Sequence, residues 1–231
     1  MFDLYIANKN YSSWSLRPWV LMKVLAIPFN EHLMPFEGGF GASHDVYTRF
    51  SPSGLVPCLV DRESDLAVWD SLAIVEYLAE QHANVWPSDK TARAWARSAT
   101  AEMHSGFGAL RNDCSMNCGV RVALNSLSTN LKADVNRLDA LWQQGLERFG
   151  GPFLAGERFS AVDAFYAPVA FRVQTFNLPM SEKSQAYVGR LLALPAMQAW
   201  YQAALEETWR EPMHEAETLK NGTLEVDYRT S

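Results

Sequence analysis

Hydroxyl side chains cluster in the turn between the first predicted strand and the first predicted helix. Ser12, Ser13 and Ser15 occupy this turn. Because the first turn of a helix presents unpaired N–H groups, a hydroxyl placed there can donate to an anionic sulfur. Such a bond favours thiolate over thiol and lowers the thiol pKa from its free value of about 8.5. Helix capping by the same serines is the structural alternative.

Two further pairs of residues suit the ends of a small peptide. Val56 and Pro57 lie at the start of a predicted strand, where a cis bond would expose the main chain of Val56 to an extended peptide ligand. Asp70 and Ser71 stand where a strand ends and a helix begins, so that free N–H groups and the Ser71 hydroxyl suit a carboxylate. Asp70 can accept from an ammonium group. A trans proline at a strand edge and an ordinary N-cap are the alternatives.

The elements that must position these residues alternate between strand and helix over residues 1–82. A strand–helix–strand unit comes first, which implies a parallel pair with a right-handed crossover. Pro18 is tolerated in the first turn of a helix, so the first helix is predicted to begin near Ser15. The predicted strands are Phe2–Ile6, 29–34, 55–60 and 66–69, and a short helix is predicted at 44–50 and a longer one after Asp70.

Strand patterns fade after a linker at 83–90, and residues 91–231 are predicted to form an all-helical domain. Ser160-x-x-Asp163 predicts a capping box at the start of one helix, where Asp163 has a folding role. The architecture is therefore a small α/β domain followed by helices. The predicted long helices span 91–110, 122–149, 160–176 and 195–207.

Composition excludes several classes of protein. Of 231 residues, 48% are hydrophobic and 20% charged, which is enough to form a core and argues against disorder. The net charge is −6 and no long basic run occurs, so no nucleic-acid partner is expected. No apolar stretch reaches the roughly 18 residues of a membrane helix, and the N-terminus has no signal-peptide pattern. We expect a cytoplasmic protein that does not bind membranes.

The three cysteines are an odd and small number, which argues against a disulfide framework. Cys114 and Cys118 are spaced about one helical turn apart, so they could bind a metal or form a redox pair. No further Cys or His completes a zinc set near them. We therefore expect packing or pocket-lining roles for this pair, core packing for Cys58, and no metal.

Four segments together resemble the glutathione S-transferase superfamily. The Ser-Ser-x-Ser-x-Arg run is most similar to the zeta-like, maleylacetoacetate isomerase type. The resemblance implies a thioredoxin-like domain at 1–82 that holds glutathione, and an all-α domain that lines a pocket for a small electrophile. It also implies a cytoplasmic homodimer with a role in detoxification. The segments are YSSWSLR at 11–17, GLVP at 54–57, WDSLAIVEYL at 69–78 and FLAGERFSAVDA at 153–164.

The resemblance implies a role for each of the residues introduced above. A zeta-like alignment makes Ser12 the residue that activates the glutathione thiol, whereas a theta-like count favours Ser13. Val56, before Pro57, would pair through its backbone with the cysteinyl unit. Ser71 would hold the γ-glutamyl carboxylate. Asp70 stands where the family often has Glu or Gln, so its contact with the ligand's ammonium is less secure.

Residues near the end of the first long helix of the second domain are implied to face the second substrate. They are His104, Phe107, Arg111 and Met116. Met and aromatic side chains suit an adaptable apolar wall, and Arg111 could hold a substrate carboxylate. The expected electrophile is apolar or aromatic.

The expected activity is conjugation of glutathione, or isomerisation if glutathione adds and leaves again. A non-catalytic ligand-binding protein on the same fold is one alternative. A glutathione-dependent peroxidase is another. Trp14 stands where several relatives carry Cys, which counts against a thiol–disulfide oxidoreductase.

Overall fold

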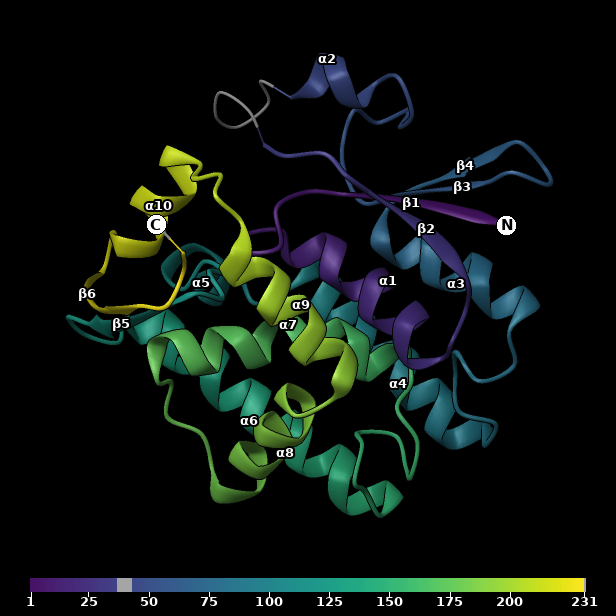
Figure 1. The fold of residues 1–231 in the computed structure, drawn as a ribbon. Helices are drawn as coiled ribbons and strands as arrows, with labels where there is room; N and C mark the ends of the chain where they lie inside the picture. The colour runs from purple at the N-terminus through teal and green to yellow at the C-terminus, as the bar shows by residue number, and fades with distance from the viewer. Residues whose placement is uncertain (37–42, 231) are drawn as a thin grey trace.

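A four-stranded mixed sheet forms the N-terminal part of the computed structural model, which describes residues 1–36 and 43–230. The strand order is β2-β1-β3-β4; β1 is parallel to β2 and antiparallel to β3, and β3 is antiparallel to β4. Three helices accompany the sheet (Figure 1). The bounds are β1 Phe2–Ile6, α1 Ser13–Val24, β2 Phe29–Leu33, α2 His44–Tyr47, β3 Cys58–Asp61, β4 Leu66–Val68 and α3 Ser71–Gln81.

Two boundaries in this part differ from the sequence prediction. Helix α1 begins at Ser13 and contains Pro18 in its interior, because the Ser12 carbonyl already accepts from the Leu16 N–H at 3.2 Å. Strand β3 begins at Cys58, which pairs with Tyr5, so the segment before it lies outside the sheet. Both differences affect segments that carry predicted site residues.

The remainder of the chain is mainly helical, which confirms the predicted fold class. Helices α8 and α10 were not expected from the sequence. Within the described residues, no helix combines the length and the apolar character needed to cross a bilayer. The bounds are α4 Lys90–Ser105, α5 Gly108–Asp113, α6 Thr129–Phe149, α7 Ala161–Phe176, α8 Glu182–Leu192, α9 Pro195–Glu206 and α10 Pro212–Leu219.

Two of the predicted long helices are interrupted. The helix expected over 91–110 breaks after Ser105, where Phe107 takes a φ of 58° and α5 starts in a new direction. The helix expected over 122–149 gives way at its start to β5 (Val120–Leu124), which pairs antiparallel with β6 (Gly222–Asp227). Val120 and Val122 are buried at alternate positions of β5, a pattern that is common for β-branched residues in strands. The helical region therefore also contains a two-stranded sheet.

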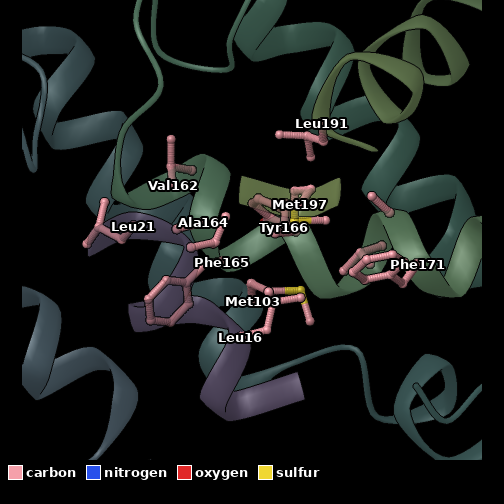
Figure 2. Close-up of a cluster of buried hydrophobic side chains, with 14 of the residues drawn as sticks. Leu16, Leu21, Met103, Val162, Ala164, Phe165, Tyr166, Phe171, Leu191 and Met197 are labelled. Atoms are coloured by element: carbon pink, nitrogen blue, oxygen red, sulfur yellow. The ribbon is translucent and has the colours of Figure 1, made fainter. Parts of the chain in front are cut away.

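One continuous core joins the two parts of the chain. Helix α1 packs against α7, and α7 is buried on nearly all sides. Figure 2 shows Leu16 and Leu21 of α1 among side chains of α7 such as Phe165, with Met103 of α4 close by. This packing fixes the N-terminal end of α1 relative to the helical region.

The predicted capping box at the start of α7 is confirmed. The Asp163 carboxylate is fully buried and accepts from the Ser160 N–H at 2.9 Å and the Leu154 N–H at 3.0 Å. It also accepts from the Tyr187 hydroxyl at 2.9 Å. Asp163 thus ties the start of α7 to the loop before it and to α8.

Candidate active site

A cavity of about 640 Å³ lies between the sheet domain and the helical region. Its wall is built from the start of α1, the segment before β3, the start of α3, and parts of α5, α7 and α10. All six residues predicted for catalysis and glutathione binding reach this one cavity, although they come from three separate segments. They are Ser12, Ser13, Val56, Pro57, Asp70 and Ser71.

The serines at the mouth of α1 differ in their hydrogen bonding. Ser12 donates its hydroxyl to Ser15 Oγ at 2.7 Å, and Ser15 Oγ also accepts from the Ala7 N–H at 3.3 Å. The Ser13 hydroxyl makes no hydrogen bond to the described residues, although the side chain is largely buried. Ser13 therefore has an uncommitted proton that faces the cavity.

The segment before β3 presents unpaired main chain. The Val56–Pro57 peptide bond is cis. The N–H and C=O of Val56 make no hydrogen bond to the described residues, because the ladder with β1 begins only at Cys58. Pro57 is buried and Val56 half-buried. An extended ligand can therefore pair with Val56 as an added strand would.

Asp70 and Ser71 form the N-terminal end of α3, where both the capping role and the ligand-binding role fit the geometry. Asp70 is the N-cap; its Oδ1 accepts from the Leu72 N–H at 2.9 Å, while its Oδ2 lies 3.3 Å from His104 Nε2. The Ser71 N–H has no acceptor among the described residues, and its hydroxyl accepts from Arg17 at 3.4 Å. The helix end and the nearby guanidinium make this a favourable site for a carboxylate.

Three arginines surround the cavity. Arg111 and Arg172 line it, and Arg17 is wholly buried between the rings of Trp14 and Phe165, with its Cζ 4.0 and 4.6 Å from their centroids. Burial, and then the charges of Arg111 and Arg172, hold the pKa of Arg17 well below its usual value. Burial and the charge of Arg111 lower the pKa of Arg172 to about 10. Three guanidinium groups are therefore clustered beside the cavity.

Of the four residues expected in the second-substrate pocket, two line the cavity and two do not. Arg111 and Met116 line the cavity, whereas His104 and Phe107 are not among its lining residues. His104 instead lies against Asp70 and the Trp14 ring, and burial lowers its pKa. Phe107 packs in the core because the break after α4 redirects the chain. The structure therefore does not place these two side chains, expected to face the pocket, on the wall of this cavity.

Helix α10 supplies a wall that the sequence analysis missed. His214 and Glu217 line the cavity, and the His214 ring stacks on Tyr11 and Phe36 with centroids 5.0 and 4.9 Å away. The Tyr11 hydroxyl donates to Glu215 Oε1 at 2.6 Å. Burial and this carboxylate raise the pKa of Tyr11, so its hydroxyl stays protonated. Nothing in the polar tail pattern indicated this contact.

Arg172 was also missed, although the sequence contained a signal for it. It is the one charged side chain between Ala164 and Phe176, in a helix without a polar face. A lone arginine in such a run must be paired or functional, because burial of an unpaired charge is costly.

The cysteines behave as packing residues. All three are buried and free. Burial raises the pKa of Cys58 and Cys118, and raises that of Cys114 to about 12, so the thiols stay protonated at neutral pH. Among the residues that the structure describes, no group of His, Cys, Asp and Glu is placed to hold a metal ion.

The chain thus joins a thioredoxin-like domain, in which Val56 before a cis proline has no main-chain partner among the described residues, to a helical region across a shared cavity. The family models agree. The glutathione S-transferase N-terminal domain matches residues 11–81, and the C-terminal domain of the same family matches residues 93–203.

Similar proteins extend this match over most of the chain. Glutathione S-transferase GstB of Escherichia coli is 27% identical over 211 residues, which cover 86% of this chain and 91% of that protein. A probable maleylacetoacetate isomerase of Vibrio cholerae is 30% identical over 212 residues, which cover 85% and 94%. The chain therefore belongs to the glutathione S-transferase superfamily.

Solved structures share the fold. A theta class glutathione S-transferase from Xanthomonas axonopodis pv. citri with glutathione bound has a TM-score of 0.63 at 23% identity, covering 87% of this chain and 96% of that one. A glutathione transferase homologue from Burkholderia with bound glutathione has a TM-score of 0.64 at 21% identity, covering 88% and 97%.

Proposed function

We propose that this protein is an enzyme that binds glutathione in the described cavity and holds its sulfur as a thiolate at the start of α1. The observation that carries the proposal is that three segments meet at one cavity. They contribute the hydroxyls of Ser12 and Ser13 at the start of α1, the main chain of Val56, which is unpaired among the described residues, and Asp70 with Ser71 at the start of α3. Each group is complementary to a different part of a γ-glutamyl tripeptide thiol.

The proposed pose follows from these complementary groups. The γ-glutamyl carboxylate lies at the Ser71 N–H and hydroxyl, and the ammonium lies at Asp70. The cysteinyl main chain pairs with Val56, which places the sulfur toward the start of α1. Ser13 donates to the sulfur, because its proton is uncommitted, while Ser12 is held by Ser15. This order of preference reverses that of the zeta-like alignment.

The thiolate then forms a bond from sulfur to an electrophilic carbon of the second substrate. In conjugation, a leaving group departs with the bonding electron pair, or a proton is taken up after addition to a double bond. In isomerisation, the carbon–sulfur bond breaks again after rotation and glutathione is released unchanged. A hydrogen bond that is stronger to thiolate than to thiol raises the share of the reactive form at neutral pH.

We also propose a cytoplasmic homodimer with a detoxifying role, with domain boundaries at residues 82 and 91. Exposed apolar side chains near the β4–α3 connection support self-association: Leu66 is 45% and Trp69 is 44% exposed. The free, buried cysteines are compatible with a reducing compartment. Light scattering coupled to size exclusion tests the dimer.

Calorimetry with glutathione and a substrate panel test the enzyme proposal. The panel holds chlorinated nitroaromatic, isothiocyanate and maleyl-type electrophiles, with an organic hydroperoxide as a separate arm. Glutathione binding with turnover of an electrophile supports the proposal. Binding without turnover of any panel member would make the protein a ligand carrier, peroxide reduction alone would make it a peroxidase, and absence of glutathione binding would refute all three.

A further inference from the structure

Arg172 is a buried cation that has no anionic partner among the described residues. Its side chain comes from α7, only 4% of the residue is exposed, and it lines the cavity. Nη1 donates to the Cys114 carbonyl, whereas Nε is buried and has no hydrogen-bond partner in the part of the chain that the structure describes. No ion pair joins Arg172 to a carboxylate within the described residues. A guanidinium in this environment retains donors for an anion that enters the cavity.

Arg111 also lines the cavity, and only part of its guanidinium is hydrogen-bonded within the described residues. Its Nε donates to the Gly106 carbonyl at 3.0 Å and its Nη2 to the Met103 carbonyl, so it caps the end of α4. Its Cζ lies 4.8 Å from the Trp14 ring centroid. Nη1 makes no hydrogen bond to the described residues. Arg111 therefore offers one further donor beside Arg172.

Charges of both signs lie around this wall, but among the described residues no carboxylate forms an ion pair with Arg172. Arg17 lies behind the two lining arginines, and the three guanidinium groups repel one another. Asp134 attracts Arg111, but its Oδ2 accepts from the Leu110 N–H. Asp70 and Glu217 line the cavity, and neither forms an ion pair with an arginine among the described residues. Burial of unpaired charge is unfavourable, so an anion bound here would relieve it.

The proposed glutathione pose does not use this wall. Its γ-glutamyl carboxylate lies at Ser71, and its main chain runs along the segment before β3, so the glycyl end continues past Val56 on the sheet domain. Arg111 and Arg172 belong instead to α5 and α7 of the helical region, and among the described residues neither forms a hydrogen bond with Asp70 or Ser71. Their donors are left for the second substrate.

We propose that Arg172, assisted by Arg111, binds a carboxylate on the electrophilic substrate, so that this enzyme acts on anionic electrophiles. The inference rests on the proposed function and names its substrate class. The planar guanidinium of Arg172 can hold a carboxylate with two parallel bonds, which a lysine cannot do. Met116 and Trp14 supply the apolar surface beside it.

The test compares 4-chloro-3-nitrobenzoate with 4-chloro-3-nitrobenzamide, which share the leaving group and differ in charge. For the wild-type protein, the ratio of kcat/KM for the benzoate to that for the benzamide exceeds the uncatalysed ratio at least tenfold. Arg172→Met lowers this ratio at least tenfold, and Arg172→Lys lowers it less. Arg158→Met, which removes an exposed charge away from the cavity, keeps the wild-type ratio.

Other outcomes separate this inference from the proposed function. An unchanged ratio in a folded Arg172→Met protein overturns it, as does a weakened affinity for glutathione with no change in the ratio. If Arg172→Met does not fold, competition in the wild-type protein decides: 3-nitrobenzoate inhibits at least tenfold more tightly than 3-nitrobenzamide, and equal inhibition overturns the inference. Loss of glutathione binding in the wild-type protein refutes the proposed function itself.

Discussion

The hydroxyl of Ser12 donates to that of Ser15 across 2.7 Å, so its proton already has an acceptor within the protein. Ser15 is wholly buried and also accepts from the Ala7 N–H, so the pair is anchored to the segment that follows β1. Ser13, the first residue of α1, is left as the hydroxyl with a free proton. The two neighbouring serines therefore differ in whether the hydroxyl proton has an acceptor among the described residues.

Ser13→Ala is expected to raise the pKa of the bound glutathione thiol and to lower kcat. A hydrogen bond to a charged group contributes about 1.5–3 kcal/mol, which corresponds to a loss of roughly 10- to 100-fold in kcat at neutral pH. Ultraviolet absorbance of the thiolate in the glutathione complex, followed against pH, measures the pKa directly.

Ser12→Ala is the matched control, and it should have the smaller effect on the thiol pKa. Its expected cost is to stability, about 0.5–1.5 kcal/mol, because one buried hydrogen bond is lost. If Ser12→Ala raised the thiol pKa more than Ser13→Ala does, Ser12 would be the direct donor, as the zeta-like alignment implied.

Asp70→Asn should separate ligand binding from helix capping. Asn is as good an N-cap as Asp, so the free energy of unfolding should change by less than about 0.5 kcal/mol. The attraction for the ligand's ammonium is lost, which should weaken glutathione binding roughly tenfold in calorimetry. A glutathione analogue without the amino group should bind both proteins equally; a tenfold difference for that analogue would assign the effect to the helix end.

Asp163→Ala should destabilise the fold without touching the cavity. Three donors lose their buried acceptor, namely the N–H groups of Leu154 and Ser160 and the Tyr187 hydroxyl. The expected loss in the free energy of unfolding is about 2–4 kcal/mol, measured by urea denaturation at neutral pH. Identical denaturation midpoints would show that the capping box contributes nothing.

The same carboxyl should make stability depend on pH in an unusual direction. Burial, opposed by its hydrogen bonds, raises the pKa of Asp163 from 3.8 to about 6. Between these values the folded state retains a proton that the unfolded state has lost, so this contribution to stability falls as pH rises and is constant above about pH 6. The difference in unfolding free energy between wild type and Asp163→Asn should shrink over that window. A difference that grows with pH would mean that the ionised form is favoured.

Arg229→Met should loosen α10. Arg229 donates to Glu215 and to Asp227 and only 4% of its side chain is exposed, so it ties the last strand to the helix that lines the cavity. Loss of this charge should cost about 1.5–3 kcal/mol locally and speed amide exchange in α10 roughly 10- to 100-fold. Peptides from α6 in the same exchange experiment serve as the internal control, and equal protection of α10 in both proteins would contradict the role.

The sequence predicted the sheet domain and its half of the cavity because those features depend on local patterns. Alternating apolar residues set β1 and β3, Asp70 marks a helix start, and Pro57 marks a chain that cannot join the ladder at that point. Ser160 and Asp163 likewise predict the start of α7, because a capping box depends only on residues close together in the sequence.

The other half of the cavity depends on contacts between segments far apart in the sequence. Strand β5 is completed by β6, about a hundred residues later, and the short alternation at Val120 and Val122 did not by itself outweigh the helical pattern that follows it. The side chain of Phe107 turned inward because of the backbone conformation at that residue, which periodicity does not reveal. The hydrogen bond from Tyr11 to Glu215 joins residues that are 204 positions apart in the sequence.

The family models end at residue 203, yet His214 and Glu217 of α10 form part of the cavity wall. The matched ranges therefore do not include the residues of α10 that line the cavity. Two relatives can match these ranges equally well and still differ in the shape of this wall, and so in the second substrate that they accept. A comparison of relatives at the residues corresponding to α10 would show whether this wall differs among them.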